Sequence, residues 1–424
     1  MIWFFIFILF INPFSLIGQP VFEDYFSDAT LRFDYYHAGS SDTSYIFLDE
    51  IKKEPSWAGS RTQLIDPFRY GEMLVEVHDA STNELIYSRG YSTLFIEWQS
   101  TSEAEHTPKS FPESVLIPFP KDSVILTLLK RDRTLEFHPL LEYTINPNSY
   151  FIEQNTKILY DTISLINNGN PATKVDVVII PDGYTAGEME KFITDAQRYT
   201  ELFFSWDPFS RNKKNFNFIA IIAPSRESGP DIPGQNTWKN TVLNSSFYTF
   251  NSERYLTTKD YHKVRDIASA VPNDQIIILV NSDKYGGGGI YNFYSTCTSD
   301  HPLSEIVFMH EFGHGFASLA DEYYSSDVSY NDFFDLSVEP YQPNITTLKN
   351  FDVKWKDLIE PGTPVPTPPT EEYIDKVGVF EGGGYVAKGI YRPTFDGTMR
   401  SEVINGFGPV NERAIQQIID LYTK

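Results

Sequence analysis

The chain has 424 residues, of which 41% are hydrophobic, and it carries a formal net charge of −23. This length and hydrophobic content predict two folded domains with sizeable cores and exclude a disordered chain. The negative charge argues against a nucleic-acid surface and against binding to anionic membranes, because both need basic patches.

The first residues predict an export signal. Ile2 to Ile11 is continuously apolar, and no charged side chain occurs before Glu23. The run is too short for a comfortable membrane span, so we expect a signal peptide over residues 1–19 and no stable membrane span. The protein is therefore predicted to be secreted, to an extracellular, periplasmic or cell-surface location. The single cysteine, Cys297, excludes an intrachain disulfide.

Residues 20–150 predict an all-β sandwich that serves as an accessory domain. Short segments rich in aromatic and β-branched residues are separated by polar turns, a pattern typical of strands at close spacing. They include residues 31–36, 72–77, 85–91 and 123–129. We expect a loop from Gln99 to Lys109.

Residues 151–170 are interpreted as a linker, and residues 171–424 as a catalytic domain. Apolar segments at 175–180, 216–222 and 275–280 predict strands, and the periodicity of 185–204 predicts a helix. Strands that alternate with helices predict a mixed sheet, so the fold class of the whole chain is α+β with an α/β catalytic part.

Two polar or glycine-rich stretches of this domain are predicted to be loops. Residues 225–233 are interpreted as a structural loop, with a calcium site or a place beside the active site as alternatives. The glycines of Tyr285 to Gly289 predict a flexible turn that leads into an edge strand over 290–294.

The sharpest chemical signal is the HExxH motif formed by His310, Glu311 and His314 within an apolar run that reads as a helix. Residues four apart lie about 40° from one another around a helix, so both imidazoles can reach one metal ion, and zinc suits such ligands. Glu311 is then placed to accept a proton from a water on the metal, as the general base of peptide hydrolysis.

A catalytic zinc needs a third protein ligand, for which Asp321 is the preferred residue. On an unbroken helix Asp321 would lie roughly 10 Å beyond His314, so the helix must end near Ala317 and let the chain turn back. Glu322 and a more distant glutamate are the alternatives, and Tyr323 or Tyr324 could instead donate a hydrogen bond to the reacting oxygen.

The sequence from His310 to Tyr324, HEFGHGFASLADEYY, resembles the active-site signature of the bacterial immunoglobulin A metallopeptidases, a secreted zinc peptidase family related to the metzincins. Four further stretches agree with this resemblance: VDVVIIPDGY at 175–184, PSRESGPDIP at 224–233, NSDKYGG at 281–287 and YRPTFDGTMR at 391–400. The similarity extends from about Val175 to the C-terminus, with a looser likeness before it.

The resemblance implies a zincin-like catalytic domain with an HExxH helix, and an edge strand that holds an extended substrate. It also implies that Met399 packs under the zinc ligands. Tyr391 is a candidate to hydrogen-bond the tetrahedral intermediate, with Arg392 as the alternative for this role or as a partner of a carboxylate. The metzincin pattern has a glycine and a ligand at the seventh and tenth residues after the first histidine, where this chain has Ala317 and Ala320.

The sequence therefore predicts a secreted zinc endopeptidase with Zn²⁺ bound by His310, His314 and Asp321, acting on protein or peptide substrates, among which the resemblance suggests immunoglobulin A. A non-catalytic protein that binds a protein or glycan on a peptidase fold is the alternative from another class. A zinc amidase acting on cell-wall peptides would share the same chemistry. The sequence does not indicate the oligomeric state.

Overall fold

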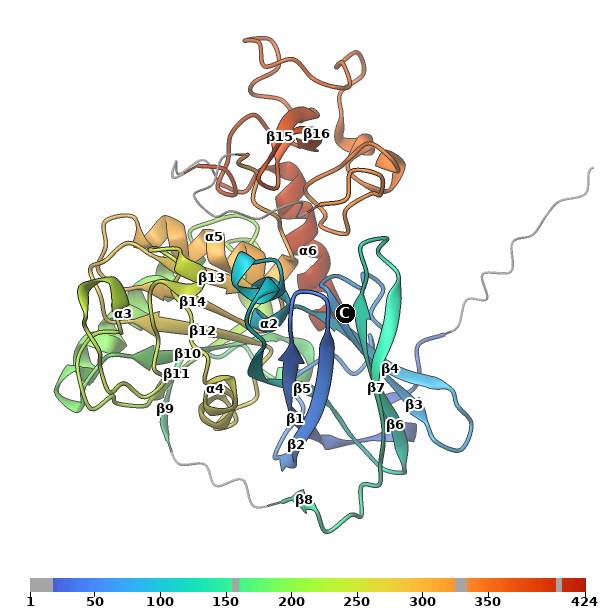
Figure 1. Ribbon diagram of the computed structural model, residues 1–424, viewed down its shortest axis with the longest axis vertical. Helices are drawn as coiled ribbons and strands as arrows, with labels where there is room; N and C mark the ends of the chain where they lie inside the picture. The colour runs from blue at the N-terminus through green and yellow to red at the C-terminus, as the bar shows by residue number, and fades with distance from the viewer. Residues whose placement is uncertain (1–17, 155–159, 325–333, 402–405) are drawn as a thin grey trace, which may run out of the picture.

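The computed structural model describes residues 18–154, 160–324, 334–401 and 406–424. The predicted signal peptide lies outside this part of the chain, apart from its last two residues. Among the described residues, no helix is both long and apolar enough to cross a membrane. Figure 1 shows a β-rich N-terminal part beside a mixed α/β part, with the segment that carries the last hairpin above them.

The N-terminal part contains two four-stranded sheets. One sheet has the order β5-β1-β2-β8 and the other β4-β3-β6-β7. The strands are β1 (Phe26–Gly39), β2 (Ser44–Glu54), β3 (Met73–Asp79), β4 (Leu85–Tyr91), β5 (Lys109–Pro120), β6 (Val124–Arg131), β7 (Phe137–Ile145) and β8 (Ile152–Glu153). The helices α1 (Phe22–Tyr25) and α2 (Leu94–Gln99) complete this part.

Both sheets contribute to one buried core. Leu31 and Phe33 of β1 and Val77 and Leu126 of the second sheet are fully buried in the same cluster. Such a shared core is what short strands with alternating apolar residues produce when two sheets pack face to face. The sequence did not predict α2, which lies just before the expected loop at 99–109 and overlaps it by one residue.

The second part is built on a six-stranded mixed sheet of order β13-β14-β12-β10-β11-β9. Its strands are β9 (Asp161–Ile166), β10 (Val175–Asp182), β11 (Phe216–Ile222), β12 (Gln275–Val280), β13 (Gly287–Ile290) and β14 (Tyr294–Thr298). The four inner strands run parallel, and β13 and β9 lie antiparallel at the two edges. The helices are α3 (Met189–Phe203), α4 (Tyr261–Ala268), α5 (Ser304–Ala317) and α6 (Pro409–Thr423).

Helices cover both faces of this sheet because successive side chains of a strand point to opposite sides. Val177 and Ile179 of β10 join the core formed with α3, α5 and α6. Val178 and Ile180 join a second core, which includes α4 and also Phe95 of α2. The N-terminal part is therefore packed directly against the sheet of the second part.

Two short strands lie within residues 151–170, the stretch expected to be a linker. Residues 152–153 pair with β2, and β9 pairs with β11 as an edge strand of the large sheet. The strand Asp161–Ile166 is only partly buried, and its sequence accordingly has a weak apolar pattern. The turn residues that follow it led to the expectation of a linker.

The glycines near residue 287 form the edge strand itself, whereas the sequence predicted a turn before it. Helix α5 lies close to this strand. A Cβ atom on Gly289 would come within 2.2 Å of the carbonyl oxygen of Glu311, and one on Gly287 within 2.6 Å of Val307 Cγ1. Glycine is therefore required here for close packing of the helix on the strand.

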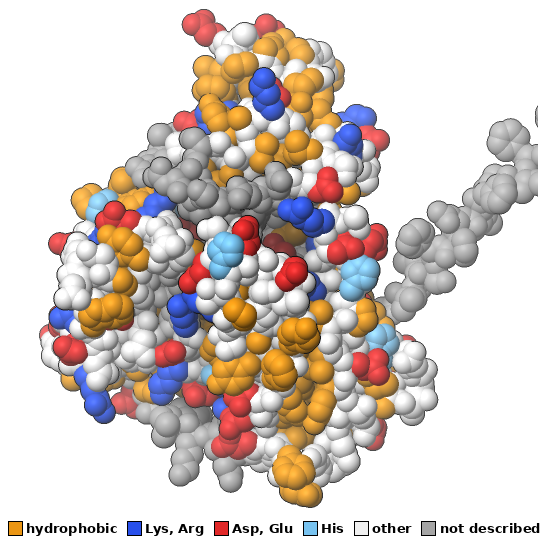
Figure 2. All heavy atoms as spheres, in the orientation of Figure 1, with side chains coloured by type: hydrophobic (Ala, Val, Ile, Leu, Met, Phe, Trp, Pro, Cys, Tyr) orange, Lys and Arg blue, Asp and Glu red, His pale blue; other side chains and the backbone are white. Residues whose placement is uncertain are grey.

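The remaining segment carries a hairpin of β15 (Phe380–Gly383) and β16 (Val386–Arg392). The proline-rich residues 361–370 contain no helix or strand and are mostly exposed. Figure 2 shows acidic and basic side chains interspersed over one face of the molecule, without a continuous basic patch on that face.

Candidate metal centre

Helix α5 carries His310, Glu311 and His314 on the side that faces a large cavity. Phe308, Phe312 and other apolar residues of the helix pack into the core, whereas the two histidines are only half-buried. This division follows from the helical period, because residues 310 and 314 lie on one face.

Backbone carbonyl groups fix the orientation of both imidazoles. Nδ1 of His310 lies 2.9 Å from the carbonyl oxygen of Thr398, and Nδ1 of His314 lies 2.5 Å from that of Leu319. A carbonyl oxygen can only accept, so each Nδ1 carries the proton and each neutral imidazole presents an unprotonated Nε2. Both Nε2 atoms point into the same space, 3.0 Å apart.

Asp321 reaches this space because the helix ends at Ala317. Ser318 adopts the left-handed conformation, with φ of 53° and ψ of 34°, and reverses the chain. Oδ1 of Asp321 then lies 3.0 Å from His310 Nε2 and 3.3 Å from His314 Nε2. The predicted turn after the helix is confirmed.

The three side chains fit a metal ion. Oδ1 of Asp321 is buried and has no hydrogen-bond partner among the described residues, and the ligand atoms of the three side chains lie within 4.8 Å of one another. Ligands at about 2.0–2.1 Å from a tetrahedral zinc lie about 3.3 Å apart, close to the separations found here. Three such atoms that face one another need positive charge between them, which a metal ion or a proton on a histidine supplies.

The protonation of the metal-free cluster reflects the same geometry. Burial lowers the pKa of His314, but the adjacent Asp321 outweighs burial and raises this pKa to about 9. Burial raises the pKa of Asp321, but the two histidines hold it well below the ordinary value. Burial also raises the pKa of Glu311. The carboxylate of Asp321 is thus held ionised where a cation would bind.

Glu322, the alternative ligand, points away from this cluster. Its Oε1 accepts hydrogen bonds from Nδ2 of Asn344 at 3.0 Å and of Asn411 at 2.9 Å. Its backbone N–H donates to the carbonyl oxygen of Met399 at 2.7 Å. Glu322 therefore anchors the turn, and Asp321 alone of the two acids faces the histidines.

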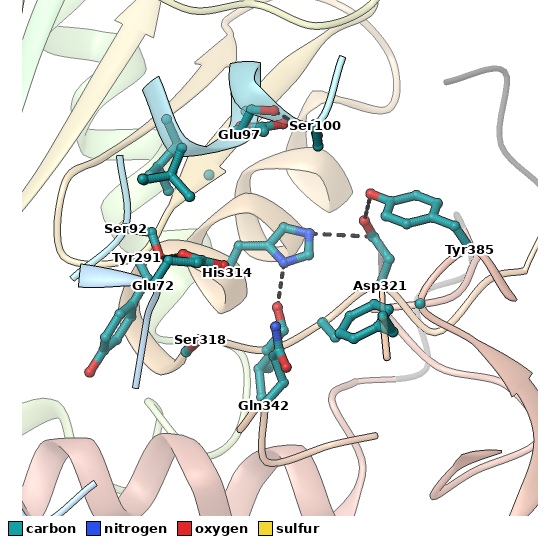
Figure 3. A pocket seen from close by; sticks show the side chains of 18 of the residues that line it. Glu72, Ser92, Glu97, Ser100, Tyr291, His314, Ser318, Asp321, Gln342 and Tyr385 are labelled. Atoms are coloured by element: carbon teal, nitrogen blue, oxygen red, sulfur yellow. Dashed lines mark hydrogen bonds and ion pairs between the residues drawn. The ribbon is translucent and has the colours of Figure 1, made fainter. Parts of the chain in front are cut away.

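The cavity beside the histidines has a volume of about 960 Å³. Its lining includes His310, Glu311, His314 and Asp321, together with residues of β13. The N-terminal part supplies another wall, with Glu72, Ser92 and Glu97 among the residues involved. Figure 3 shows His314 between Glu72 and Ser92 on one side and Asp321 and Tyr385 on the other.

The N-terminal wall of the cavity is bonded to the rest of the chain. Glu72 accepts hydrogen bonds from the hydroxyl groups of Ser92 and Tyr341, and Glu97 accepts one from Tyr255. Residues 92–99 were not predicted to belong to the site, because the contact that brings them there is formed between distant segments.

Two family models match the chain. Residues 163–376 match the model described as IgA Peptidase M64, and residues 21–142 match the model of the Peptidase M64 N-terminus. The chain belongs to the IgA peptidase M64 family. No curated protein matches the chain. Membership of a peptidase family makes the protein a hydrolase of protein substrates and agrees with the metal-binding geometry of His310, His314 and Asp321.

The sequence of this M64 peptidase did not predict the role of Tyr385. The hydroxyl group of Tyr385 donates to Oδ2 of Asp321, and the backbone N–H of Gly384 donates to the carbonyl oxygen of Asp321 at 2.8 Å. The turn between β15 and β16 thus holds Asp321 in place. The glycines before Tyr385 indicated only a turn, and nothing local linked that turn to residue 321.

The structure does not bring Tyr391 into the cluster. Its backbone pairs with that of Thr346. Its side chain is half-buried and is not among the described residues that line the cavity. Tyr323 does line the cavity, with its ring 5.3 Å from that of Tyr385, whereas Tyr324 is exposed. Because successive side chains of a strand point to opposite sides, the side chain of Tyr391 in β16 does not face the cavity.

Met399 lies where the resemblance implied. It is fully buried, and a Cβ atom on Gly313 of α5 would lie 3.0 Å from its sulfur. The preceding residue, Thr398, supplies the carbonyl oxygen that His310 contacts. The turn at 398–399 therefore packs against helix α5 and orients His310.

The edge strand of the M64 peptidase is partly covered. The backbone of Gly287 accepts a hydrogen bond from the N–H of Leu256 at 3.0 Å and donates one to the carbonyl oxygen of Arg254 at 3.3 Å. The resemblance implied that this edge receives an extended substrate along its length. In the structure, the segment 254–256 already occupies the start of the edge.

Proposed function

We propose that this M64 peptidase is a secreted zinc endopeptidase whose catalytic centre comprises His310, Glu311, His314 and Asp321. The observation that carries the proposal is the convergence of Nε2 of His310, Nε2 of His314 and Oδ1 of Asp321 in a cavity that also contains Glu311. The apolar run before residue 12 supports export. The mixed sheet and the helix α5 support a zincin-like fold.

In this proposal His310, His314 and Asp321 hold the metal. A zinc ion bound there supplies Lewis acidity for the scissile carbonyl group and lowers the pKa of water at its open position. Because Nδ1 of each histidine donates to a carbonyl oxygen, of Thr398 or of Leu319, Nε2 is the nitrogen left to bind the metal. Tyr385 fixes the carboxylate of Asp321, and the N-terminal part supplies one wall of the cavity.

Glu311 is the proposed general base. It lines the same cavity, and its side chain lies against Gly287 of the edge strand. Its carboxylate takes a proton from the attacking water and then delivers it to the leaving amine. Burial raises its pKa, which brings the group closer to the range in which a base works near neutral pH.

The size of the cavity supports a protein segment as the substrate. A volume of about 960 Å³ lies at the upper end of the range for small-molecule pockets, and the walls combine apolar, acidic and basic side chains. Immunoglobulin A is proposed as a substrate on the description of the family alone.

The proposal is tested by incubating a library of protein-derived peptides with the mature chain and with Glu311→Gln, and identifying the cuts by mass spectrometry. Only the wild-type chain is expected to cut, while both proteins retain one zinc per chain by elemental analysis. Glu305→Gln, at an exposed site of the same helix that pairs with Arg198, is the matched control and should cut normally.

Three outcomes would contradict the proposal. Equal cutting by the wild-type chain and Glu311→Gln would remove Glu311 from the mechanism. Zinc-loaded wild-type chain that cuts neither peptides nor folded immunoglobulin A would favour a binding protein on a peptidase fold. Cleavage of muropeptides alone would identify an amidase of cell-wall peptides.

A further inference from the structure

A second cavity lies between the N-terminal strands and helix α4. Its volume is about 240 Å³, and its lining shares no residue with that of the large cavity. The N-terminal wall includes Glu54 and Arg89, and the opposite wall includes Arg265 of α4 and Asp274. Neither the metal centre nor the proposed peptidase chemistry uses this space.

Two buried guanidinium groups face the cavity from the two parts of the molecule. Arg89 of β4 is 9% exposed and Arg265 of α4 is 4% exposed. Nη1 of Arg265 donates to Oδ1 of Asn273 at 3.0 Å. Within the described chain, Nε and Nη2 of Arg265 and Nη1 of Arg89 have no hydrogen-bond partner.

The acids that line the same cavity attract these guanidinium groups but form no ion pair with them, and each has a closer partner. Glu54 pairs with Nη1 of Arg32 at 3.4 Å, and Oδ2 of Asp274 accepts the backbone N–H of Asp176 at 2.8 Å. Burial and the neighbouring Asp176 raise the pKa of Asp274 well above its ordinary value. None of the ion pairs found in the described part of the chain includes Arg89 or Arg265.

Buried charges in proteins are normally paired, because transfer of an unpaired charge out of water is costly. We propose that this cavity binds a small oxyanion between Arg89 and Arg265. The planar fork of a guanidinium matches the paired oxygens of a phosphate, a sulfate or a carboxylate. The space corresponds to about eight water molecules at ~30 Å³ each, so it accommodates such an anion with its remaining waters.

The bound anion would join the two parts of the chain, since one guanidinium comes from each. It therefore stabilises the contact through which the N-terminal wall of the large cavity is positioned. The proposal concerns binding only and is independent of the proposed peptidase activity.

The test begins with the wild-type mature chain dialysed into an amine buffer with sodium chloride. Phosphate, sulfate and acetate are added in separate titrations at constant ionic strength, and binding is followed by calorimetry and by thermal unfolding. At least one of the three is expected to bind with a stoichiometry of one and to raise the midpoint of unfolding saturably. The three titrations distinguish a tetrahedral oxyanion from a carboxylate.

Arg89→Gln and Arg265→Gln are each expected to weaken this binding at least tenfold. Arg211→Gln is the matched control, because Arg211 is half-exposed and pairs with Glu412 at 2.9 Å. Equal binding by all the variants, or the absence of saturable binding to the wild-type chain, would overturn the proposal.

A direct measurement covers the case in which the arginine variants fail to fold. Crystals of the wild-type chain soaked in selenate are expected to show an anomalous peak between the guanidinium groups of residues 89 and 265. A cavity that contains only water under these conditions would overturn the proposal.

Discussion

The metal centre and the cavity between Arg89 and Arg265 are opposites in chemistry. The first brings together three acceptors, which are Nε2 of His310, Nε2 of His314 and Oδ1 of Asp321. The second brings together donors that have no acceptor within the described chain. In each place, contacts with neighbouring residues hold the acceptors or the donors in position. In both places, the polar groups left without a partner therefore indicate the charge of the group that is missing.

Asp321 is the residue whose loss is expected to have the largest effect on the metal centre. Asp321→Ala removes the only acid among the three acceptors and is expected to lower zinc affinity by about 100-fold or more. This loss is larger than the one expected for a residue that only orients a metal ligand. The affinity is measured by competition with a chelator.

The adjacent residue provides the control. Glu322→Ala should retain zinc but lower the free energy of unfolding by about 1–3 kcal/mol, because two buried asparagine side chains lose their acceptor. If zinc affinity fell more in Glu322→Ala, the ligand would be residue 322.

Tyr385→Phe tests the support of the acceptor set. It removes the hydroxyl group that donates to Asp321 and is expected to weaken zinc binding by about 10-fold to 100-fold. Tyr391→Phe changes a tyrosine outside the cavity wall and should bind zinc like the wild type. Equal affinities of the two variants would show that Asp321 needs no such support.

The acids near the second cavity make stability depend on pH. Burial raises the pKa of Asp176 to about 7 from 3.8, although the hydrogen bond from Asn217 opposes the rise. The folded state therefore keeps a proton that the unfolded state releases from about pH 4 upward. This contribution is present at low pH and is lost as the pH rises towards 7.

Asp176→Asn should remove this loss. Relative to the wild type, the free energy of unfolding of the variant is expected to be higher at pH 8 than at pH 5, by on the order of 1–3 kcal/mol. Denaturant unfolding at the two pH values measures the difference. Asp283→Asn, which changes an exposed acid, is the control. An unchanged pH dependence in Asp176→Asn would mean that this carboxyl group is ionised in the folded state at both pH values.

The smallest expected effect concerns the turn that delivers Asp321. Ser318→Val places a β-branched residue at a φ of 53° and should lower the free energy of unfolding by roughly 1–2 kcal/mol. Ser318→Gly should be nearly neutral, because relief of strain is offset by greater freedom of the unfolded chain. Equal stability of both variants would argue against strain at this residue.

The sequence predicted the parts of the site that depend on local pattern. The spacing of His310 and His314 fixed a shared helical face, and the distance to Asp321 required the helix to end near Ala317. The left-handed residue is Ser318, one residue after the position of the metzincin glycine. The carboxylate also comes one residue late, so the two departures compensate each other.

Long-range contacts explain what the sequence could not predict. The choice between Asp321 and Glu322 depends on Asn344 and Asn411, which lie far along the chain and bind Glu322. The support by Tyr385 depends on a turn 64 residues after Asp321. Likewise, the strand at 161–166 is specified by its pairing with β11, and the glycines of β13 by the helix packed on them.

The hydrogen bond from Tyr341 to Glu72 joins a residue late in the chain to the first strands. A chimera that exchanged only the C-terminal half between two members of the family would therefore exchange only one wall of the cleft. Transfer of cleavage preference from one member to another should require both halves to be moved together, with this pair of residues kept matched.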